Sequence, residues 1–345
     1  MGIPNHGGRR PVNSTDNLVP LTTERWRRPS VRARTINRLL ERTSRRYVRK
    51  LTGDLTPELT AGFARIDPMC AAIRAPRATR TESVVIDEFS GEWVHGEGVT
   101  SRRDGAILYV HGGGWMFGGL NSHRALISRL SATSGLPALA LNYRMHPTVS
   151  LVQEVEDCLA GYRWLLDRGV SPDRIVLMGD SAGGHLAVTA ALRARSEKLA
   201  TPAALVGISG VYDLDPGGKR EHPNAKRDPA GFMGGLTWLI ETVGKGLDTS
   251  AAHLSPVRAD LQGLPPTLLV VSGSEIVYSD SERLSRQLAA AGVPCHLHVW
   301  DGQPHVFPML APLIPEARLA IAQIGRFVRN AVTSARSRPG SNDLG

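Results

Sequence analysis

A serine on a glycine-flanked turn is the first feature of this sequence that could do chemistry. The stretch Gly179-Asp180-Ser181-Ala182-Gly183 fits the pattern G-x-S-x-G, in which the serine is a nucleophile exposed on a sharp turn. It lies between an apolar run at 174–178 and a helical pattern at 182–196. A strand before the turn and a helix after it are the setting that this motif requires, and the helix N-terminus favours developing negative charge. Ser181 is therefore the candidate nucleophile.

A run of glycines supplies candidate partners for that negative charge. The stretch His111-Gly112-Gly113-Gly114-Trp115 directly follows an apolar run. Acyl transfer passes through a tetrahedral intermediate that bears a full oxyanion, which bare backbone N–H groups can approach closely. We predict that the N–H groups of Gly112, Gly113 and Ala182 form an oxyanion hole. His111 is interpreted as a residue that organises the loop.

An acid and a base are expected later in the chain, each on a loop that follows a strand. Glu275 comes just after the apolar run 267–271, whereas Asp280 falls in the next helix and is interpreted as a surface or capping group. His305 follows the turn after the run 295–300. The histidine would take the serine proton and pass it to the leaving alkoxide, while the glutamate would orient the imidazole.

These residues need elements that bring them together, and the sequence supplies such elements from about residue 82. Strands are predicted at 106–110, 138–141, 174–178, 204–208, 267–271 and 295–300, and helices at 153–168, 182–196 and 316–333. Buried strands separated by amphipathic helices are typical of a mostly parallel sheet with helices on both faces. The carboxyl ends of parallel strands meet at one edge, where the three candidate residues would converge.

Two segments depart from this alternation and are predicted to form a cap. Residues 1–30 are polar and aperiodic, which predicts a disordered basic tail. Residues 31–81 contain a helix from Val31 and a second short helix near Pro57. The apolar stripe of the first helix comprises Ile36, Leu39, Leu40, Tyr47 and Leu51.

The second departure is an insertion at 213–253 within a catalytic domain at 82–335, and a flexible tail is expected at 336–345. The insertion and the N-terminal helices are predicted to cover the carboxyl edge of the sheet. The pocket beneath them is predicted to be lined by Trp115, Met116, Phe117, Phe232 and Trp238.

Charge and cysteine content narrow the functional classes. The chain has 345 residues and a net charge of +9; residues 1–80 carry 17 basic and 6 acidic side chains, and the remainder sums to −2. No nucleic-acid motif accompanies the basic segment, so its charge is interpreted as a solvated outer face. The three cysteines lack metal-ligand spacing, which favours reduced thiols and a cytoplasmic location. No signal peptide and no apolar run long enough for a membrane helix are visible.

Together these motifs resemble the hormone-sensitive-lipase-like bacterial esterases, family IV of the α/β-hydrolase superfamily. The resemblance covers about residues 82–333 and also rests on Asn142-Tyr143-Arg144, on 155–158 with 162–166, and on 302–307. It implies an α/β-hydrolase fold with an eight-stranded sheet and a helical cap, and hydrolysis of short-chain acyl esters without cofactor or metal. This chain departs from the family at Met145-His146-Pro147-Thr148, and it has Glu275 where most members have aspartate.

Three other functions remain open on the sequence. A lactone or amide hydrolase, or an N-deacetylase, would use the same serine, acid and histidine. A non-catalytic binding protein of this fold would be expected to lack one of them. A membrane-surface or nucleic-acid protein would use the basic N-terminus. We favour an esterase of small-molecule esters that binds no nucleic acid and does not insert stably into a membrane, with a homodimer as a possible assembly.

Overall fold

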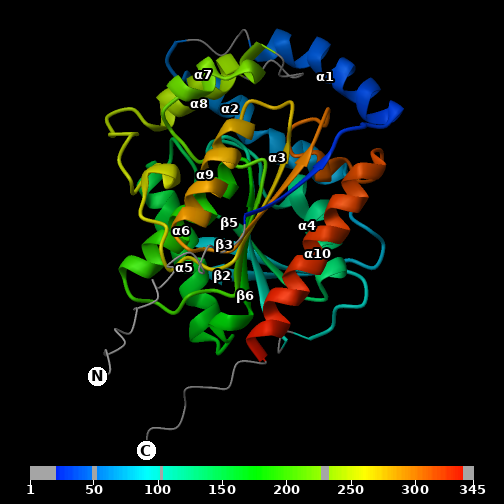
Figure 1. Ribbon diagram of the computed structural model, residues 1–345, viewed down its shortest axis with the longest axis vertical. Helices are drawn as coiled ribbons and strands as arrows, with labels where there is room; N and C mark the ends of the chain where they lie inside the picture. Colours follow the sequence, from blue (N-terminus) through cyan, green and yellow to red (C-terminus); the bar gives the residue numbers. More distant parts are fainter. Residues whose placement is uncertain (1–20, 49–52, 102–103, 227–232, 337–345) are drawn as a thin grey trace, which may run out of the picture.

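A nine-stranded sheet forms the centre of the protein (Figure 1). The computed structural model describes residues 21–48, 53–101, 104–226 and 233–336. In spatial order the strands are β1 (Leu21–Trp26), β9 (Cys295–Trp300), β8 (Thr267–Ser272), β7 (Ala204–Ile208), β6 (Ile175–Asp180), β4 (Ala106–Val110), β5 (Ala138–Asn142), β3 (Phe89–His95) and β2 (Arg80–Ile86). All neighbours pair in parallel except β3, which is antiparallel to both β2 and β5.

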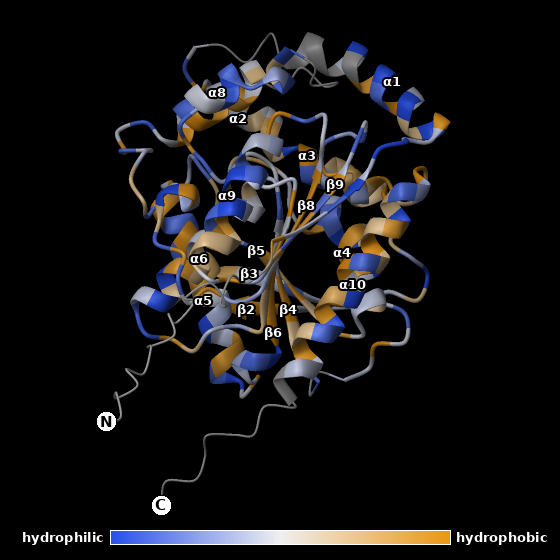
Figure 2. Ribbon diagram, viewed as in Figure 1, coloured by the Kyte–Doolittle hydropathy of each residue, from blue (hydrophilic) through white to orange (hydrophobic). Residues whose placement is uncertain are grey.

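Alternating side chains of the central strands supply two separate cores. In β4, Leu108 and Val110 belong to one hydrophobic cluster, while Ile107 and Tyr109 belong to the other. Successive side chains of a strand point to opposite faces, so a strand covered on both sides must be apolar throughout. All five residues of β4 are buried, and Figure 2 shows the strands as the most hydrophobic part of the interior. This explains why continuous apolar runs predicted these strands correctly.

Helices cover both faces of the sheet (Figure 1). One face packs against α4 (Leu120–Ser134) and α10 (Pro315–Arg336), the other against α5 (Leu151–Asp167), α6 (Ala182–Ser196) and α9 (Tyr278–Ala290). Most residues of α6 are buried on all sides, because it lies between the sheet and α5. None of the helices in the described ranges has the length and apolarity needed to cross a bilayer.

The N-terminal strand β1 differs from the sequence prediction. Residues 21–26 pair in parallel with β9 and make nine strands where eight were expected. The Trp26 ring stacks on Trp300 with centroids 4.1 Å apart, and Arg25 forms two hydrogen bonds with Asp301. These contacts are with residues far away in the chain, which is why the local composition predicted a disordered tail here. Residues 1–20 and 337–345 lie outside the described residues.

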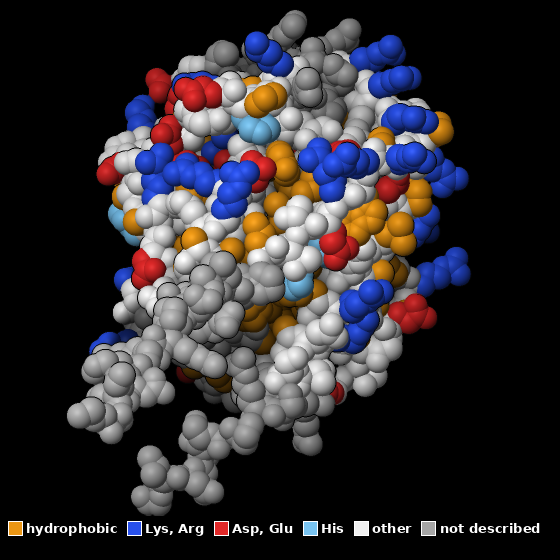
Figure 3. Space-filling model, in the orientation of Figure 1, with side chains coloured by type: hydrophobic (Ala, Val, Ile, Leu, Met, Phe, Trp, Pro, Cys, Tyr) orange, Lys and Arg blue, Asp and Glu red, His pale blue; other side chains and the backbone are white. Residues whose placement is uncertain are grey.

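The remaining helices form a layer over one end of the sheet, where Figure 1 shows α1 (Val31–Val48), α2 (Pro57–Ala64), α7 (Gly217–Glu221) and α8 (Met233–Val243). The predicted stripe of α1 is buried only in part: Ile36 is partly buried and packs against the core, but Leu39 is 62% exposed. Ala33 and Asn37, which the prediction left out, are buried on the same helix. The Asn37 side chain donates a hydrogen bond to the Gly302 carbonyl. Lys and Arg side chains gather on the outer surface of this layer (Figure 3).

We expect Trp26→Ala to lower the free energy of unfolding by about 2–3 kcal/mol, since a half-buried ring loses its contact with Trp300. Arg25→Ala, which removes a partly exposed ion pair from the same strand, should cost less than about 1 kcal/mol. Urea unfolding of both variants measures the difference. Equal, small effects would mean that β1 contributes little to the stability of the sheet.

Candidate active site

The nucleophile candidate Ser181 lies on a strained turn between β6 and α6. Its φ of 51° is in the left-handed region, and a Cβ at Gly183 would lie 2.1 Å from the Val110 carbonyl oxygen. Only a residue without a side chain allows the helix to start this close to β4. The Ser181 N–H donates to the Ile208 carbonyl at 2.9 Å, and its own carbonyl accepts the Val211 N–H at 3.3 Å. The backbone on both sides of the hydroxyl is thus held in place.

The three residues predicted from different parts of the chain form one hydrogen-bonded line. His305 Nε2 lies 2.9 Å from Ser181 Oγ, and His305 Nδ1 lies 2.6 Å from Glu275 Oε2. Glu275 is 2% exposed, and its other oxygen accepts the Ser272 N–H at 2.7 Å and the Ser209 hydroxyl at 2.8 Å. A carboxylate fixed at one oxygen presents the other to the imidazole in a set orientation.

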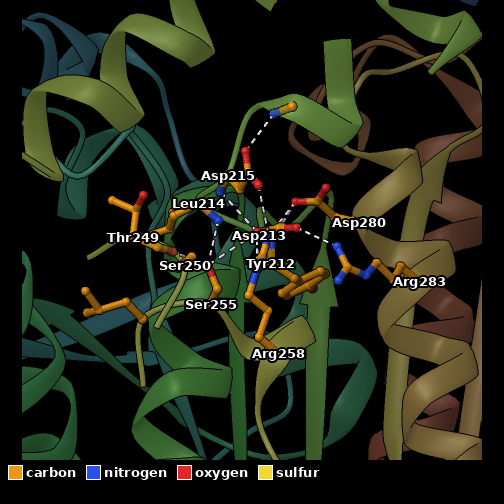
Figure 4. A network of polar contacts seen from close by, with 12 residues as sticks. Tyr212, Asp213, Leu214, Asp215, Thr249, Ser250, Ser255, Arg258, Asp280 and Arg283 are labelled. Carbon is orange, nitrogen blue, oxygen red and sulfur yellow. Dashed lines mark hydrogen bonds and ion pairs between the residues drawn. The ribbon is translucent and has the colours of Figure 1, made fainter. Parts of the chain in front are cut away.

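Asp280, the rival acid, has a different environment from the predicted surface or capping position. It lies in the first turn of α9 and is 3% exposed. Its carboxylate forms a 3.0 Å ion pair with the buried Lys219. It also accepts the N–H groups of Tyr212 and Asp213 (Figure 4). Burial raises the pKa of Asp280, and the charge of Lys219 offsets only part of that effect. The pattern alone could not show that an insertion residue would return to pair with α9.

The acidic residues around this pair form a wider network. Asp213 lies 2.6 Å from Arg283 and 3.4 Å from Arg258, and Arg258 also pairs with Asp215 at 2.9 Å (Figure 4). These contacts join the loop after β7 to α9 and to the short helix η4 (Pro256–Arg258). The start of the insertion is therefore anchored on the catalytic body.

The glycine loop after β4 lies beside the turn that carries Ser181. Gly113 has φ of 131°, and a Cβ there would lie 1.7 Å from the Phe117 carbonyl oxygen, so a side chain is excluded. The Gly112 N–H, which the sequence predicts as an oxyanion donor, instead donates to Asp180 Oδ1 at 3.1 Å. Gly113 and Gly114 both line the cavity in front of Ser181, and Ala182 begins a helix, where N–H groups have no intrahelical acceptor.

A buried polar cluster supports this loop from behind. Asp180 Oδ1 also accepts the Tyr109 hydroxyl at 2.7 Å, and Asp180 Oδ2 lies 3.4 Å from His123 Nε2. The His111 Nδ1–H donates to the Gly112 carbonyl at 2.8 Å, and its ring stacks on Tyr143. Burial, with the charge of His123, lowers the pKa of His111 to about 4. His111 is therefore neutral near pH 7 and holds the loop through a hydrogen bond.

The pKa values of Asp180 and His123 shift in opposite directions. Burial by itself raises the pKa of Asp180. The charge and hydrogen bond of His123 lower it by more than burial raises it, so the pKa lies below 3.8. Burial likewise lowers the pKa of His123, but the charge and hydrogen bond of Asp180 raise it above 6.5. Each group thus favours the charged form of the other.

We expect the coupling between these two side chains to be largest between about pH 4 and pH 6.5. The lowered pKa of Asp180 stabilises the fold above pH 3.8, and that contribution is lost as the pH falls through the folded-state pKa. The raised pKa of His123 stabilises it fully below pH 6.5, and that contribution is lost as the pH rises through the folded-state pKa. A double-mutant cycle of Asp180→Asn and His123→Gln by urea unfolding near pH 5 and pH 9 measures the coupling. A coupling that grows toward pH 9 would contradict this assignment.

A mostly apolar cavity of about 340 Å³ opens in front of Ser181 and His305. Its walls include Trp115 and Phe117, as predicted, but neither Met116 nor Trp238 is among the lining residues. Trp238 instead donates its indole N–H to the Gly53 carbonyl at 2.7 Å. The predicted pocket residue Phe232 lies outside the described residues.

Both predicted cap segments contribute to this cavity. The insertion contributes Leu236 and Leu239 from α8, and the N-terminal segment contributes Ile66 and Cys70 from α3 (Ile66–Met69) and the turn after it. Asp67 fixes α3 in place by accepting the N–H and hydroxyl of Ser122 at the start of α4. Hydrophobic walls from two distant segments therefore face the candidate nucleophile.

Three side chains of the site were not singled out by the sequence analysis. Asp180 lies inside the serine motif and was read only as its variable position. Ser209 follows the carboxyl end of β7, the same kind of position that identified Glu275. His123 carries no sequence signal, since it reaches Asp180 only through the packing of α4. Within the described ranges, no group of three or more His, Cys, Asp or Glu side chains is placed to hold a metal ion.

A serine on a strained strand-to-helix turn, followed in chain order by an acid and a histidine on later strand ends, defines a protein of the α/β-hydrolase class. A family model described as the alpha/beta hydrolase fold matches residues 107–309. The chain belongs to this family and, within it, to the branch of esterases related to hormone-sensitive lipase. It is a carboxylic ester hydrolase by class.

Individual relatives agree with this assignment. Esterase LipU of Mycobacterium tuberculosis is 38% identical over 289 residues, which cover 81% of this chain and 96% of that protein. Carboxylesterase/phospholipase LipF of the same organism is 37% identical over 290 residues, covering 81% and 77%. A crystal structure of an esterase from the bacterial hormone-sensitive lipase family matches with a TM-score of 0.79 and 34% identity, covering 88% of this chain and 100% of that one.

Proposed function

We propose that the protein is a serine carboxylesterase that hydrolyses short-chain acyl esters, with Ser181 as nucleophile, His305 as general base and Glu275 as the acid that orients it. The observation that carries this proposal is the unbroken line of two hydrogen bonds from Ser181 Oγ through the imidazole to Glu275. Both bonds are within the range required for proton transfer and for fixing the imidazole tautomer.

In the acylation step, Ser181 Oγ attacks the ester carbonyl carbon while His305 Nε2 takes its proton. The resulting imidazolium is stabilised by the Glu275 carboxylate, 2.6 Å away at Nδ1. The tetrahedral intermediate collapses by breaking the bond to the alcohol oxygen, which takes the proton from Nε2 and leaves. Water then attacks the acyl-serine with His305 again as base, which releases the carboxylic acid and restores the hydroxyl.

Backbone N–H groups of Gly113, Gly114 and Ala182 are the proposed oxyanion donors. Gly112 is left out because its N–H already binds Asp180. Asp180 would serve this step indirectly, since its hydrogen bond to Gly112 ties the glycine loop to the turn that carries Ser181. Donors fixed before the reaction need no reorganisation when the negative charge develops.

The cavity supports a preference for small acyl groups. Its volume of about 340 Å³ lies at the low end of the roughly 300–1,000 Å³ range of ligand pockets. Its walls are largely aliphatic and aromatic, which favours the burial of a few methylene groups and disfavours a charged acyl chain. A long chain would have to extend past the cap residues Leu236 and Leu239.

A series of p-nitrophenyl esters from acetate to laurate tests this function. We expect kcat/KM to be highest for butanoate or hexanoate and to fall about tenfold or more by laurate, because the pocket cannot enclose the longer chain. The matched p-nitroanilide of the best acyl group is the control, and should be hydrolysed far more slowly. Faster turnover of the anilide, or a rate that rises up to laurate, would contradict the proposal.

A further inference from the structure

The loop that follows β7 contacts two of the proposed triad residues, Ser181 and Glu275, and the residue next to the third, although none of its own residues reacts. Ser209 at its start reaches Glu275 and the residue after His305, and Val211 donates its N–H to the Ser181 carbonyl. Further along, Tyr212 and Asp213 donate their N–H groups to Asp280 (Figure 4). The nucleophile, acid and base come from three other loops, so this loop is a common support for them.

Within this loop, the Ser209 hydroxyl forms the hydrogen bonds to the acid and to the loop that carries the base. It donates to Glu275 Oε1 at 2.8 Å and accepts the Val306 N–H at 3.2 Å. Ser209 is completely buried and does not line the cavity, so neither substrate nor bulk solvent can replace these bonds. One hydroxyl therefore links the acid to the backbone of the loop that carries the base.

Backbone strain marks the same position. Six non-glycine residues of the described chain have positive φ, and four of them are Trp115, Ser181, Ser209 and Val306. Each of these four lies on a different loop of the site. Such conformations are unfavourable for residues with a side chain and persist only where the surroundings enforce them. The bond from Val306 N–H to Ser209 Oγ joins two of the strained residues directly.

We propose that Ser209 is a positioning residue of the hydrolytic reaction, which aligns the Glu275 carboxylate with His305 through its hydroxyl. This inference rests on the proposed function of Ser181, Glu275 and His305. Without the hydroxyl, Glu275 Oε1 keeps only the Ser272 N–H, and the Val306 N–H loses its bond to the loop after β7. The carboxylate and the imidazole can then move relative to each other, which slows proton transfer but does not change the walls of the substrate pocket.

The test compares Ser209→Ala and Ser209→Gly with Ser285→Ala. Ser285 is also completely buried, and its hydroxyl bonds to the Glu282 carbonyl within α9, away from the reacting groups. Glycine suits a φ of 49° better than alanine does, so the pair of Ser209 variants separates loss of the hydroxyl from backbone strain. We expect both to lower kcat about 10- to 100-fold with KM within about twofold, whereas Ser285→Ala keeps kcat.

Urea unfolding and the variant Ser181→Ala are measured in parallel. A retained kcat in Ser209→Ala, a loss in the alanine but not the glycine variant, or an equal loss in Ser285→Ala would each overturn the positioning role. Because Ser209→Gly relieves strain, it provides the readout if the alanine variant does not fold. Wild-type turnover by folded Ser181→Ala would instead overturn the proposed function, which distinguishes the two failures.

Discussion

Ser181→Ala is expected to lower kcat by about three or more orders of magnitude while the protein remains folded. The hydroxyl is the only group proposed to form a covalent bond with the acyl carbon, and what activity is left would come from the oxyanion donors and substrate binding. The Ser181 side chain forms a hydrogen bond with His305 and is partly exposed, so its removal leaves no large buried cavity. The assay is hydrolysis of p-nitrophenyl butanoate, with circular dichroism to check the fold.

Ser196→Ala is the matched control for this variant. Ser196 ends α6, the helix that begins beside the nucleophile, and its hydroxyl bonds to the Arg193 carbonyl at 2.7 Å. Its removal should leave kcat within about twofold, since an exposed hydroxyl at a helix end contributes little. A folded Ser181→Ala protein with the turnover of Ser196→Ala would exclude Ser181 as the nucleophile.

Glu275→Gln should lower kcat by about three to four orders of magnitude with little loss of stability. The amide has the shape of the carboxylate but no charge to stabilise the imidazolium, and its NH₂ group can force the wrong histidine tautomer. The two donors to Oε1, Ser272 N–H and the Ser209 hydroxyl, select the amide oxygen for that position, so the NH₂ group faces His305 Nδ1. Steady-state kinetics on the folded protein measure the effect.

Asp280→Asn should instead cause a large loss of stability and only a small loss of kcat. It leaves the buried Lys219 without its charged partner, so we expect a loss of about 3–5 kcal/mol in the free energy of unfolding. The folded fraction should keep kcat within about tenfold, because Asp280 contacts the loop after β7 and not His305. If Asp280→Asn lowers kcat per folded molecule more than Glu275→Gln does, Glu275 is not the acid of the reaction.

Most of the sheet could be predicted because its strands are buried on both faces. The predicted runs at 106–110, 204–208 and 295–300 coincide with β4, β7 and β9. The antiparallel pair β2 and β3 was missed, because both strands mix polar and apolar residues; β2 lies at the edge of the sheet and is largely exposed. A half-exposed strand has no continuous apolar run, and its pairing is decided by the neighbouring strands.

The candidate residues of the site could also be predicted from short stretches of sequence, since each lies in a recognisable motif or directly after a predicted strand. Ser181, Glu275 and His305 were chosen because they follow strands, and the carboxyl ends of parallel strands meet at one edge. That rule predicts proximity but not hydrogen bonds. The engagement of Gly112 with Asp180, and the bond from Ser209 to Glu275, depend on distances that only the packed strands establish.

By itself the sequence determined the order of the central strands and helices, the candidate residues for the reaction and the family, because these follow from short-range patterns. The tertiary structure decided what those patterns leave open. It added β1 to the sheet through Trp26 and Trp300, and it buried Asp280 against Lys219 from the insertion. It also paired the Gly112 N–H with Asp180. In each case the energy comes from contacts between residues far apart in the chain, whose partners no local window contains.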